Sequence, residues 1–233
     1  MVAPTDGPVL IYCAAGNPRF AAIAVEAGFA YGAQLPGHVS QPNLYMSDQD
    51  WKSPNRAAYM QALQAHRPVM ASVLDLEREE QLPEVLSWAE EAAQWAQESV
   101  MIIPKAFDVI DRIPLVIGGK AVVLGYSVPT RFGGTCVPIW EFAGRPVHLL
   151  GGSPHRQMRE YHALSGMSPV VSADGNMAQR QALRYCQYWS AVKRDGDNWV
   201  ALNRETKGAD DLYEAFRLSC VNVMQAWKEI DRR

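Results

Sequence analysis

Aspartates follow several short apolar segments of this chain, at positions where they could bind a ligand or take part in catalysis. Asp75 comes directly after residues 69–74, Asp174 lies just past residues 170–172, and Asp48 and Asp50 close another such segment. In α/β folds ligands bind at the carboxyl ends of the strands, so these carboxylates are expected to share one edge. Two carboxylates at such a site permit a displacement like that of a retaining glycosidase, one acting as nucleophile and the other moving protons.

Polar clusters that contain glycine or serine end other apolar segments. One follows residues 121–124, another follows residues 147–150, and an asparagine lies just after Asp174. The candidate binding residues in these clusters are Gly125, Tyr126, Ser127, Gly151, Gly152, Ser153 and Asn176. A glycine-rich loop at residues 129–138 is longer than a minimal connection needs, and its Arg131 is our first candidate for a phosphate contact.

The elements that must position these residues alternate between strands and helices. Near-continuous apolar segments are typical of parallel strands covered on both faces, and they occur at 9–13, 29–35, 43–47, 69–74, 100–103, 121–124, 147–150 and 170–172. Helices are predicted over 18–27, 53–65, 79–98, 107–111, 154–164, 177–189 and 210–230. Because this rhythm is typical of a β/α barrel or a wound sheet, we expect an α/β fold, a compact (β/α)8-type TIM barrel. The barrel is predicted to form a catalytic domain over 1–189, with a C-terminal helical extension at 190–233 packed on it.

Composition limits the partners of the protein. With 233 residues, 48% of them hydrophobic, the chain can bury one substantial core. A net charge of −3 gives no overall basic footprint, so contact with nucleic acid needs a local patch. The alternative interpretation of such basic residues is a set of solvated helix faces. The candidate patch is Arg156, Arg159, Arg180, Arg184, Lys193 and Arg194.

The sequence also limits compartment and metal content. No apolar segment is long enough to span a membrane and the N-terminus lacks a signal peptide, so we expect a cytoplasmic protein with no membrane partner. The four cysteines are scattered and form no CxxC pair, which argues against a zinc site and a disulfide framework. Cys13 and Cys220 are expected to pack as small apolar residues. We expect no metal site.

Four segments resemble, in the same order, motifs of the tRNA-guanine transglycosylases. They are VMASVLDLEREEQLPEVLSWAEEAAQW, VVLGYSV, HLLGGSPHRQ and VVSADGNMAQR, which together extend over roughly residues 69–180. The likeness is closer still to the phage and bacterial branch that exchanges guanine in DNA for a 7-deazaguanine, and to a phage-associated group with the signatures GYSVPTRxGGT and HLLGGSPHxQ. The resemblance therefore implies a transferase, a pentosyltransferase that works on the barrel without a cofactor.

The resemblance also implies roles for the aspartates. Asp174 matches the nucleophile that forms a covalent aspartyl–sugar intermediate, and Asp75 matches the aspartate that reads the edge of the base. Asp48 or Asp50 matches the general base, although the Ser-Gly-Gly that follows this residue in the family is missing here. The implied partners are guanine-containing DNA and a free 7-deazaguanine base, in the host cytoplasm if a phage encodes the chain. A protein partner is left open.

Other residues would surround the base. The resemblance matches Gly151 and Gly152 to backbone that approaches the base, and residues 125–127 to the loop beside it. An extruded base needs stacking partners. Tyr126, Phe132 and Trp140 are the candidates.

Departures from the family leave alternatives open. The late CxCxxC…H zinc site of the tRNA enzymes is missing, which counts against tRNA as substrate. One alternative function is a nucleoside or DNA N-glycosidase or hydrolase on the same barrel, and another is a non-catalytic barrel that binds bases or nucleic acid. At the residue level, Asp174 and Asp75 could each cap a following helix, and His148 could be a core histidine with satisfied hydrogen bonds. Residues 151–154 could form an anion site at a helix start.

Overall fold

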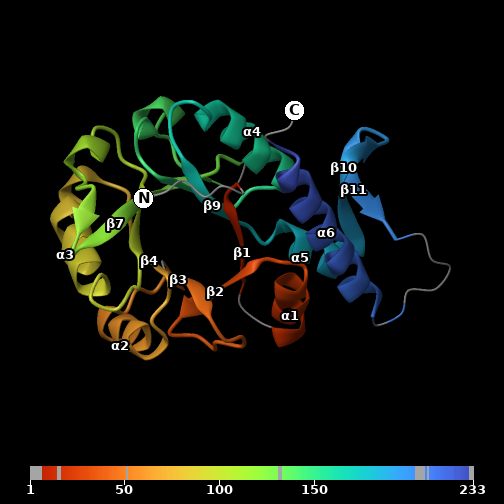
Figure 1. The fold of residues 1–233 in the computed structure, drawn as a ribbon, viewed down its shortest axis with the longest axis horizontal. Coiled ribbons are helices and arrows are strands. Elements are labelled where there is room, and N and C mark those ends of the chain that lie inside the picture. The colour runs from red at the N-terminus through yellow and green to blue at the C-terminus, as the bar shows by residue number, and fades with distance from the viewer. Residues whose placement is uncertain are drawn as a thin grey trace.

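Eight parallel strands close into a barrel. Figure 1 shows this barrel in the computed structural model, which describes residues 7–14, 17–50, 52–130, 133–202, 208 and 210–230. The barrel strands are β1 (Val9–Cys13), β2 (Ala30–Leu35), β3 (Leu44–Gln49), β4 (Met70–Leu76), β5 (Ser99–Pro104), β7 (Lys120–Ser127), β8 (Val147–Leu150) and β9 (Val170–Asp174). Each strand pairs in parallel with the next, and the pairings of β5 with β7 and of β1 with β9 close the ring. The predicted α/β fold of the TIM-barrel type is confirmed. The short strand β6 (Val116–Ile117), which pairs antiparallel with β7, was not predicted.

Helices surround the barrel on its outer face (Figure 1). They are α1 (Pro18–Glu26), α2 (Arg56–His66), α3 (Leu82–Ala92) and α4 (Pro154–Leu164). Short 3-10 helices lie in the connections after β4, β5 and β7: η1 (Glu79–Gln81), η2 (Ile110–Arg112) and η3 (Ile139–Phe142). α3 is shorter than the predicted helix over 79–98. The backbone N–H groups of Gln97 and Glu98 donate to the carbonyls of Pro68 and Val69, so this stretch already leads into β5 and leaves the helix.

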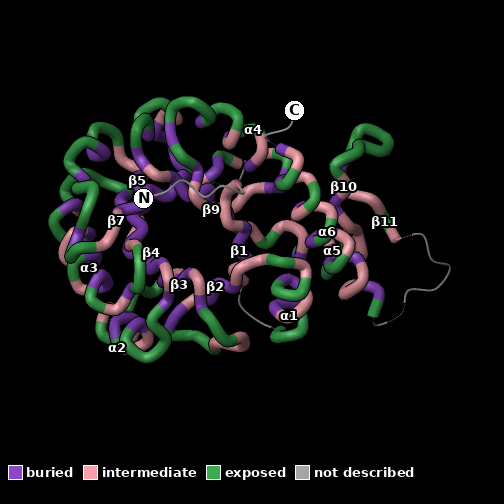
Figure 2. The backbone as a smooth tube through the Cα atoms, in the orientation of Figure 1, coloured by how far each residue is buried: buried purple, intermediate pink, exposed green. Residues whose placement is uncertain are grey.

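The core has two parts, and Figure 2 shows buried residues along the barrel strands. The larger part lies between the barrel and its helices. The smaller part contains the buried residues Ile11, Met46, Met70, Met101, Ile103 and Val123. Met101 and Ile103 lie two positions apart on β5, and Ile11 lies two positions from the partly buried Val9 and Cys13 on β1, which is how side chains that point into a barrel are spaced. The barrel interior is therefore packed, and space for a ligand must lie at its mouth, at the carboxyl ends of the strands.

A hairpin and two helices follow the last barrel strand. α5 (Met177–Tyr185), β10 (Gln187–Arg194), β11 (Asp197–Ala201) and α6 (Asp211–Lys228) lie together on the right flank in Figure 1. The predicted helix over 177–189 is wrong in its last part, because Cys186 adopts a left-handed conformation (φ 53°) that ends α5. Trp189 then lies in β10, where its backbone N–H donates to Ser219 Oγ of α6.

The hairpin spans the predicted domain boundary. The boundary between 189 and 190 falls inside β10, and the C-terminal extension is a hairpin plus a helix rather than helical throughout. α6 packs on the barrel as expected: its Phe216 lies edge-on to Tyr12 of β1, with ring centroids 5.5 Å apart. Among the described helices, none is long and apolar enough to cross a membrane.

Candidate active site at the barrel mouth

Asp174 is the last residue of β9, and a buried histidine holds its carboxylate. His148 of β8 is fully buried, with Nε2 3.2 Å from Asp174 Oδ1 and Nδ1 2.7 Å from Ser172 Oγ. If the Ser172 hydroxyl donates to Nδ1, Nε2–H is free to donate to the carboxylate, and a neutral ring satisfies both contacts. The Asp174 side chain is only 13% exposed. His148 is thus a core histidine with satisfied hydrogen bonds, and it also positions Asp174.

The loop after β8 contributes further contacts to the end of β9. The Gly151 N–H lies 3.0 Å from the Asp174 carbonyl oxygen and 3.3 Å from its Oδ1. Gln157 of α4 ties the two segments together, since its Nε2 donates to the carbonyls of Gly151 and Asp174. Gly151 and Gly152 have φ of +67° and +81°, so glycine is required for this approach of the loop to the strand end.

Two candidate binding residues lie where helices begin. Ser153 precedes α4 and its Oγ is 3.2 Å from His155 Nδ1, while Asn176 precedes α5 and caps it through no side-chain bond. Asp174 itself belongs to the strand and does not cap α5.

Asp48 of β3 is the second carboxylate at the mouth. Its Oδ1 accepts a hydrogen bond from Ser72 Oγ at 3.1 Å, and Ser72 Oγ in turn accepts from the Gln49 N–H. Burial and, next, the negative charge of Asp174 raise the pKa of Asp48 to about 7, with a smaller contribution from Asp75. Asp174 therefore lies close enough to Asp48 to favour the protonated form of Asp48, although the two residues are far apart in the sequence.

Asp50, the alternative to Asp48, has different contacts. It follows the end of β3, where its carboxylate accepts from the Lys52 backbone N–H at 3.1 Å. It lines a separate cavity of about 310 Å³ together with Gln34 and His38. Of the two aspartates, Asp48 is the one that the fold brings to Asp174.

Cys13, the last residue of β1, belongs to the same mouth. Burial, followed by the charges of Asp174 and Asp48, raises the pKa of its thiol well above the usual value. A thiol beside two carboxylates is therefore neutral at physiological pH. We expected Cys13 to be a packing residue, and its place at the mouth was not anticipated.

Asp75 lies within β4, so it does not cap the following helix. Its Oδ2 is ion-paired with Lys105 Nζ, and the same ammonium group lies 3.9 Å from Glu77 Oε1. A cavity of about 510 Å³, ample for a purine, opens beside Asp75 and is lined also by Gln49 and Glu77. Sequence reasoning missed Lys105, although it follows the apolar segment 100–103 by the same logic that selected Asp75.

Several predicted contacts do not gather at this site. Tyr126 is 5% exposed and packs outward against Phe142, with ring centroids 5.1 Å apart, so it is wrong as a stacking residue. Gly125 faces the packed interior, and the backbone carbonyl of Ser127 accepts from the Thr135 N–H. Trp140 is 64% exposed on η3. The predictions for Arg131 and Phe132 fall outside the described residues.

Part of the predicted basic patch gathers between α4 and the hairpin. Desolvation and the charges of Arg156, Lys193 and Arg159 together lower the pKa of His155. Three cationic side chains of the patch therefore lie near His155, together with the carboxylate of Asp197, whose charge acts in the opposite direction. Arg159 is partly neutralised by its ion pair with Glu160 at 2.6 Å.

Within the described residues, no group of three or more His, Cys, Asp or Glu side chains could hold a metal ion. The sequence pattern of one protein family, described as "Family of unknown function (DUF6610)", matches residues 24–228. No curated protein matches the chain.

Proposed function

Because the chain belongs to the DUF6610 family, whose description assigns no function, we propose its function from the site itself. The proposed protein is a DNA-guanine transglycosylase-like enzyme that exchanges guanine in DNA for a 7-deazaguanine base through a covalent aspartyl–sugar intermediate. The observation that carries the proposal is the pair Asp174 and Asp48. Two neighbouring carboxylates in different surroundings are suited to the separate roles of nucleophile and acid–base catalyst.

Asp174 is the proposed nucleophile. Its Oδ1 is held by the His148 ring and the Gly151 N–H, whereas Oδ2 has no hydrogen-bond partner among the described residues. In the first displacement Oδ2 attacks the anomeric carbon, a carbon–oxygen bond to the sugar forms, and the bond from the sugar to guanine breaks. Donors already in place around Oδ1 fix the direction of attack, so little reorganisation is needed.

Asp48 is the proposed acid–base catalyst. With a pKa of about 7 it is present in both protonation states near neutral pH, which is the condition for efficient proton transfer. Protonated Asp48 gives its proton to the departing guanine. The resulting carboxylate then takes the proton from the incoming 7-deazaguanine as that base attacks the sugar and releases Asp174.

The choice of guanine and DNA rests on further features. The sequence motifs resemble those of guanine-exchanging enzymes, and Asp75 offers a carboxylate to the donor edge of guanine. The cationic side chains around His155 supply a local positive surface for a phosphate backbone on a chain of net charge −3. To reach the mouth, a base would have to be extruded from the duplex or lie in a single strand.

The test is an exchange assay. Purified protein is incubated with guanine-containing single- and double-stranded DNA, with and without free 7-deazaguanine bases, and nucleosides from the digested DNA are quantified by mass spectrometry. We expect the 2′-deoxynucleoside of the incoming 7-deazaguanine in the digested DNA and an equal amount of released guanine, both lost in Asp174→Asn. Guanine release without incorporation would favour the N-glycosidase, and binding without either product would favour a non-catalytic barrel.

A further inference from the structure

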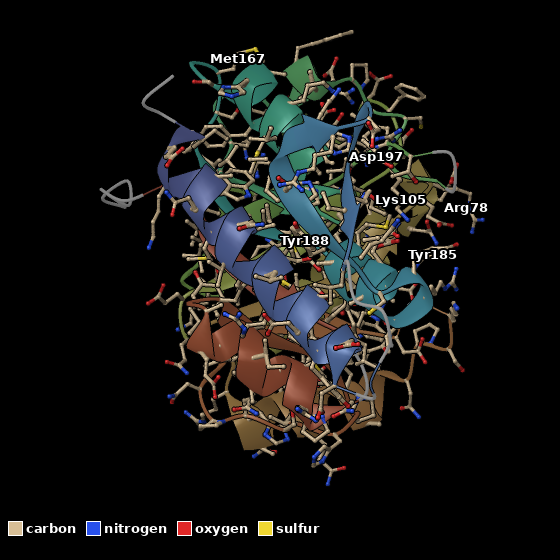
Figure 3. The ribbon with its side chains drawn as sticks, turned by 90° about the vertical axis from the view of Figure 1, so that its right-hand side faces the viewer. Arg78, Lys105, Met167, Tyr185, Tyr188 and Asp197 are labelled. Atoms are coloured by element: carbon tan, nitrogen blue, oxygen red, sulfur yellow. The ribbon has the colours of Figure 1, made fainter. Side chains whose placement is uncertain are left out.

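Lys105 is a second charged group at the Asp75 end of the mouth, and its backbone is fixed from two sides. Its N–H donates to the Leu76 carbonyl of β4 at 2.9 Å, and its own carbonyl accepts from Cys136 Sγ at 3.2 Å. Thr135 Oγ1 donates to the neighbouring Pro104 carbonyl at 3.1 Å. Figure 3 labels Lys105 and Arg78 toward the right of the view; since both residues follow barrel strands, this is the mouth side. The anchoring gives the ammonium group a defined starting point next to Asp75.

The ion pair leaves bonding capacity on both partners. The side chains of Lys105 and Asp75 are 26% and 17% exposed, so both still reach solvent at the mouth. An ammonium group has three N–H donors and a carboxylate accepts about four hydrogen bonds. Lys105 can therefore keep Asp75 and donate to a ligand, while Asp75 accepts from the same ligand.

An acceptor beside a donor is the complement of one edge of guanine. That edge presents the O6 acceptor next to the N1–H and 2-amino donors. Adenine presents a 6-amino donor in place of O6, which would face the ammonium group with no acceptor between them. A site that offers polar groups to a substrate rejects analogues that leave those groups unpaired.

We propose that Lys105 is a specificity-determining residue that donates to O6 of the bound guanine or 7-deazaguanine, while Asp75 accepts from N1–H and the 2-amino group. This inference rests on the proposed function, since it assigns the chemistry of the base that the same site takes. Lys105 and Asp75 remain ion-paired when the base binds, so neither charged group has to give up its partner in order to bind the base. Lys105 holds Asp75 in the acceptor orientation and completes the pattern at O6.

The experiment separates the two halves of the pattern with three free bases. Guanine carries all the groups, 6-thioguanine replaces O6 by a weak sulfur acceptor, and hypoxanthine lacks the 2-amino group. Dissociation constants are measured by calorimetry for the wild type and the variants Lys105→Met, Lys105→Arg and Asp75→Asn. Lys120→Met is the matched control, because Lys120 begins β7 at the opposite end of the barrel and donates to the Gln97 carbonyl.

We expect the wild type to prefer guanine over 6-thioguanine by about tenfold to a hundredfold, the usual effect of one hydrogen bond to a charged group. Lys105→Met should erase most of that preference and keep the preference over hypoxanthine, whereas Asp75→Asn should mainly lower the preference over hypoxanthine. Lys105→Arg should retain part of the O6 preference, and Lys120→Met all of it. Circular dichroism confirms that each variant is folded.

Two outcomes overturn the inference in distinguishable ways. If the wild type exchanges guanine but Lys105→Met keeps the full preference over 6-thioguanine, Lys105 does not read O6 and the proposed function stands. If the wild type neither exchanges nor binds any of the three bases, the proposed function fails and the inference falls with it.

Discussion

Asp48 makes stability depend on pH in a direction that its surroundings determine. Because the folded protein raises the pKa of this group from 3.8 to about 7, the native state binds the proton more tightly than the unfolded chain. Below about pH 4 Asp48 is protonated in both states and does not lower the free energy of unfolding. Between about pH 4 and pH 7 it lowers the free energy of unfolding progressively, and above about pH 7 this destabilisation is constant. At 1.36 kcal/mol per pKa unit that cost is about 4 kcal/mol at most.

Asp48→Asn should remove this cost while keeping an acceptor for Ser72. We expect the variant to be more stable than the wild type at pH 8, with an advantage that shrinks toward pH 5, as measured by urea unfolding across this range. Asp50→Asn, two residues on, makes the same substitution at an aspartate that accepts from the Lys52 N–H and has no hydrogen bond to Ser72. An advantage that is independent of pH would show that Asp48 is not buried beside Asp174 as described. The variant should also lose base exchange, a trade of activity for stability typical of catalytic groups.

His148 acts on Asp174 through one hydrogen bond, so the loss of exchange rate should depend on whether the replacing side chain can still donate. His148→Leu removes the donor to Oδ1, and we expect the rate of exchange to fall about tenfold to a hundredfold. His148→Gln can place an amide N–H near the position of Nε2 and should recover much of the rate. Single-turnover kinetics on DNA measures both. Equal losses in the two folded variants would mean that the ring fills space and does not orient Asp174.

At the scale of elements, interior side chains of β5 and β8 crowd β7 at Gly125. A Cβ at Gly125 would lie 2.5 Å from Leu150 Cδ1 and 2.7 Å from Ile103 Cγ1. We expect Gly125→Ala to lower the free energy of unfolding by about 1–3 kcal/mol through overpacking. Gly208→Ala is the control, since the nearest atom of a described residue to its added Cβ would be 3.9 Å away. Chemical denaturation with no difference between the two variants would contradict the packing described for the barrel interior.

The C-terminal hairpin shows where local patterns mislead. Residues 177–189 continue a helical pattern past Tyr185, and nothing nearby forbids a longer helix. The strand that forms instead depends on distant groups. β10 pairs with β11, and Trp189 is buried with its backbone N–H donating to Ser219 Oγ of α6. Tertiary contacts of this kind override helix propensity. By contrast, α4 was predicted at its observed bounds because Pro154 at its start is a strong local signal.

For the whole molecule, the barrel was predictable and the site only partly so. Eight apolar segments with polar ends predict parallel strands and place Asp174 and Asp75 at the mouth. The sequence cannot say which side chains meet across the ring, because that depends on strand register and on the closure between β5 and β7. Three features depend on contacts of this kind: the position of Asp48 rather than Asp50 near Asp174, the hydrogen bond between His148 and Ser172, and the ion pair between Lys105 and Asp75.

The central claim is that Asp174 forms a bond to the sugar. The most direct measurement is the intact mass of the protein after incubation with guanine-containing DNA without an incoming base, for the wild type and Asp174→Asn. The account predicts a protein–DNA adduct that has lost guanine, absent in Asp174→Asn and released when 7-deazaguanine is added. An adduct that persists in Asp174→Asn, or base exchange by the wild type with no adduct at any time, would contradict the account.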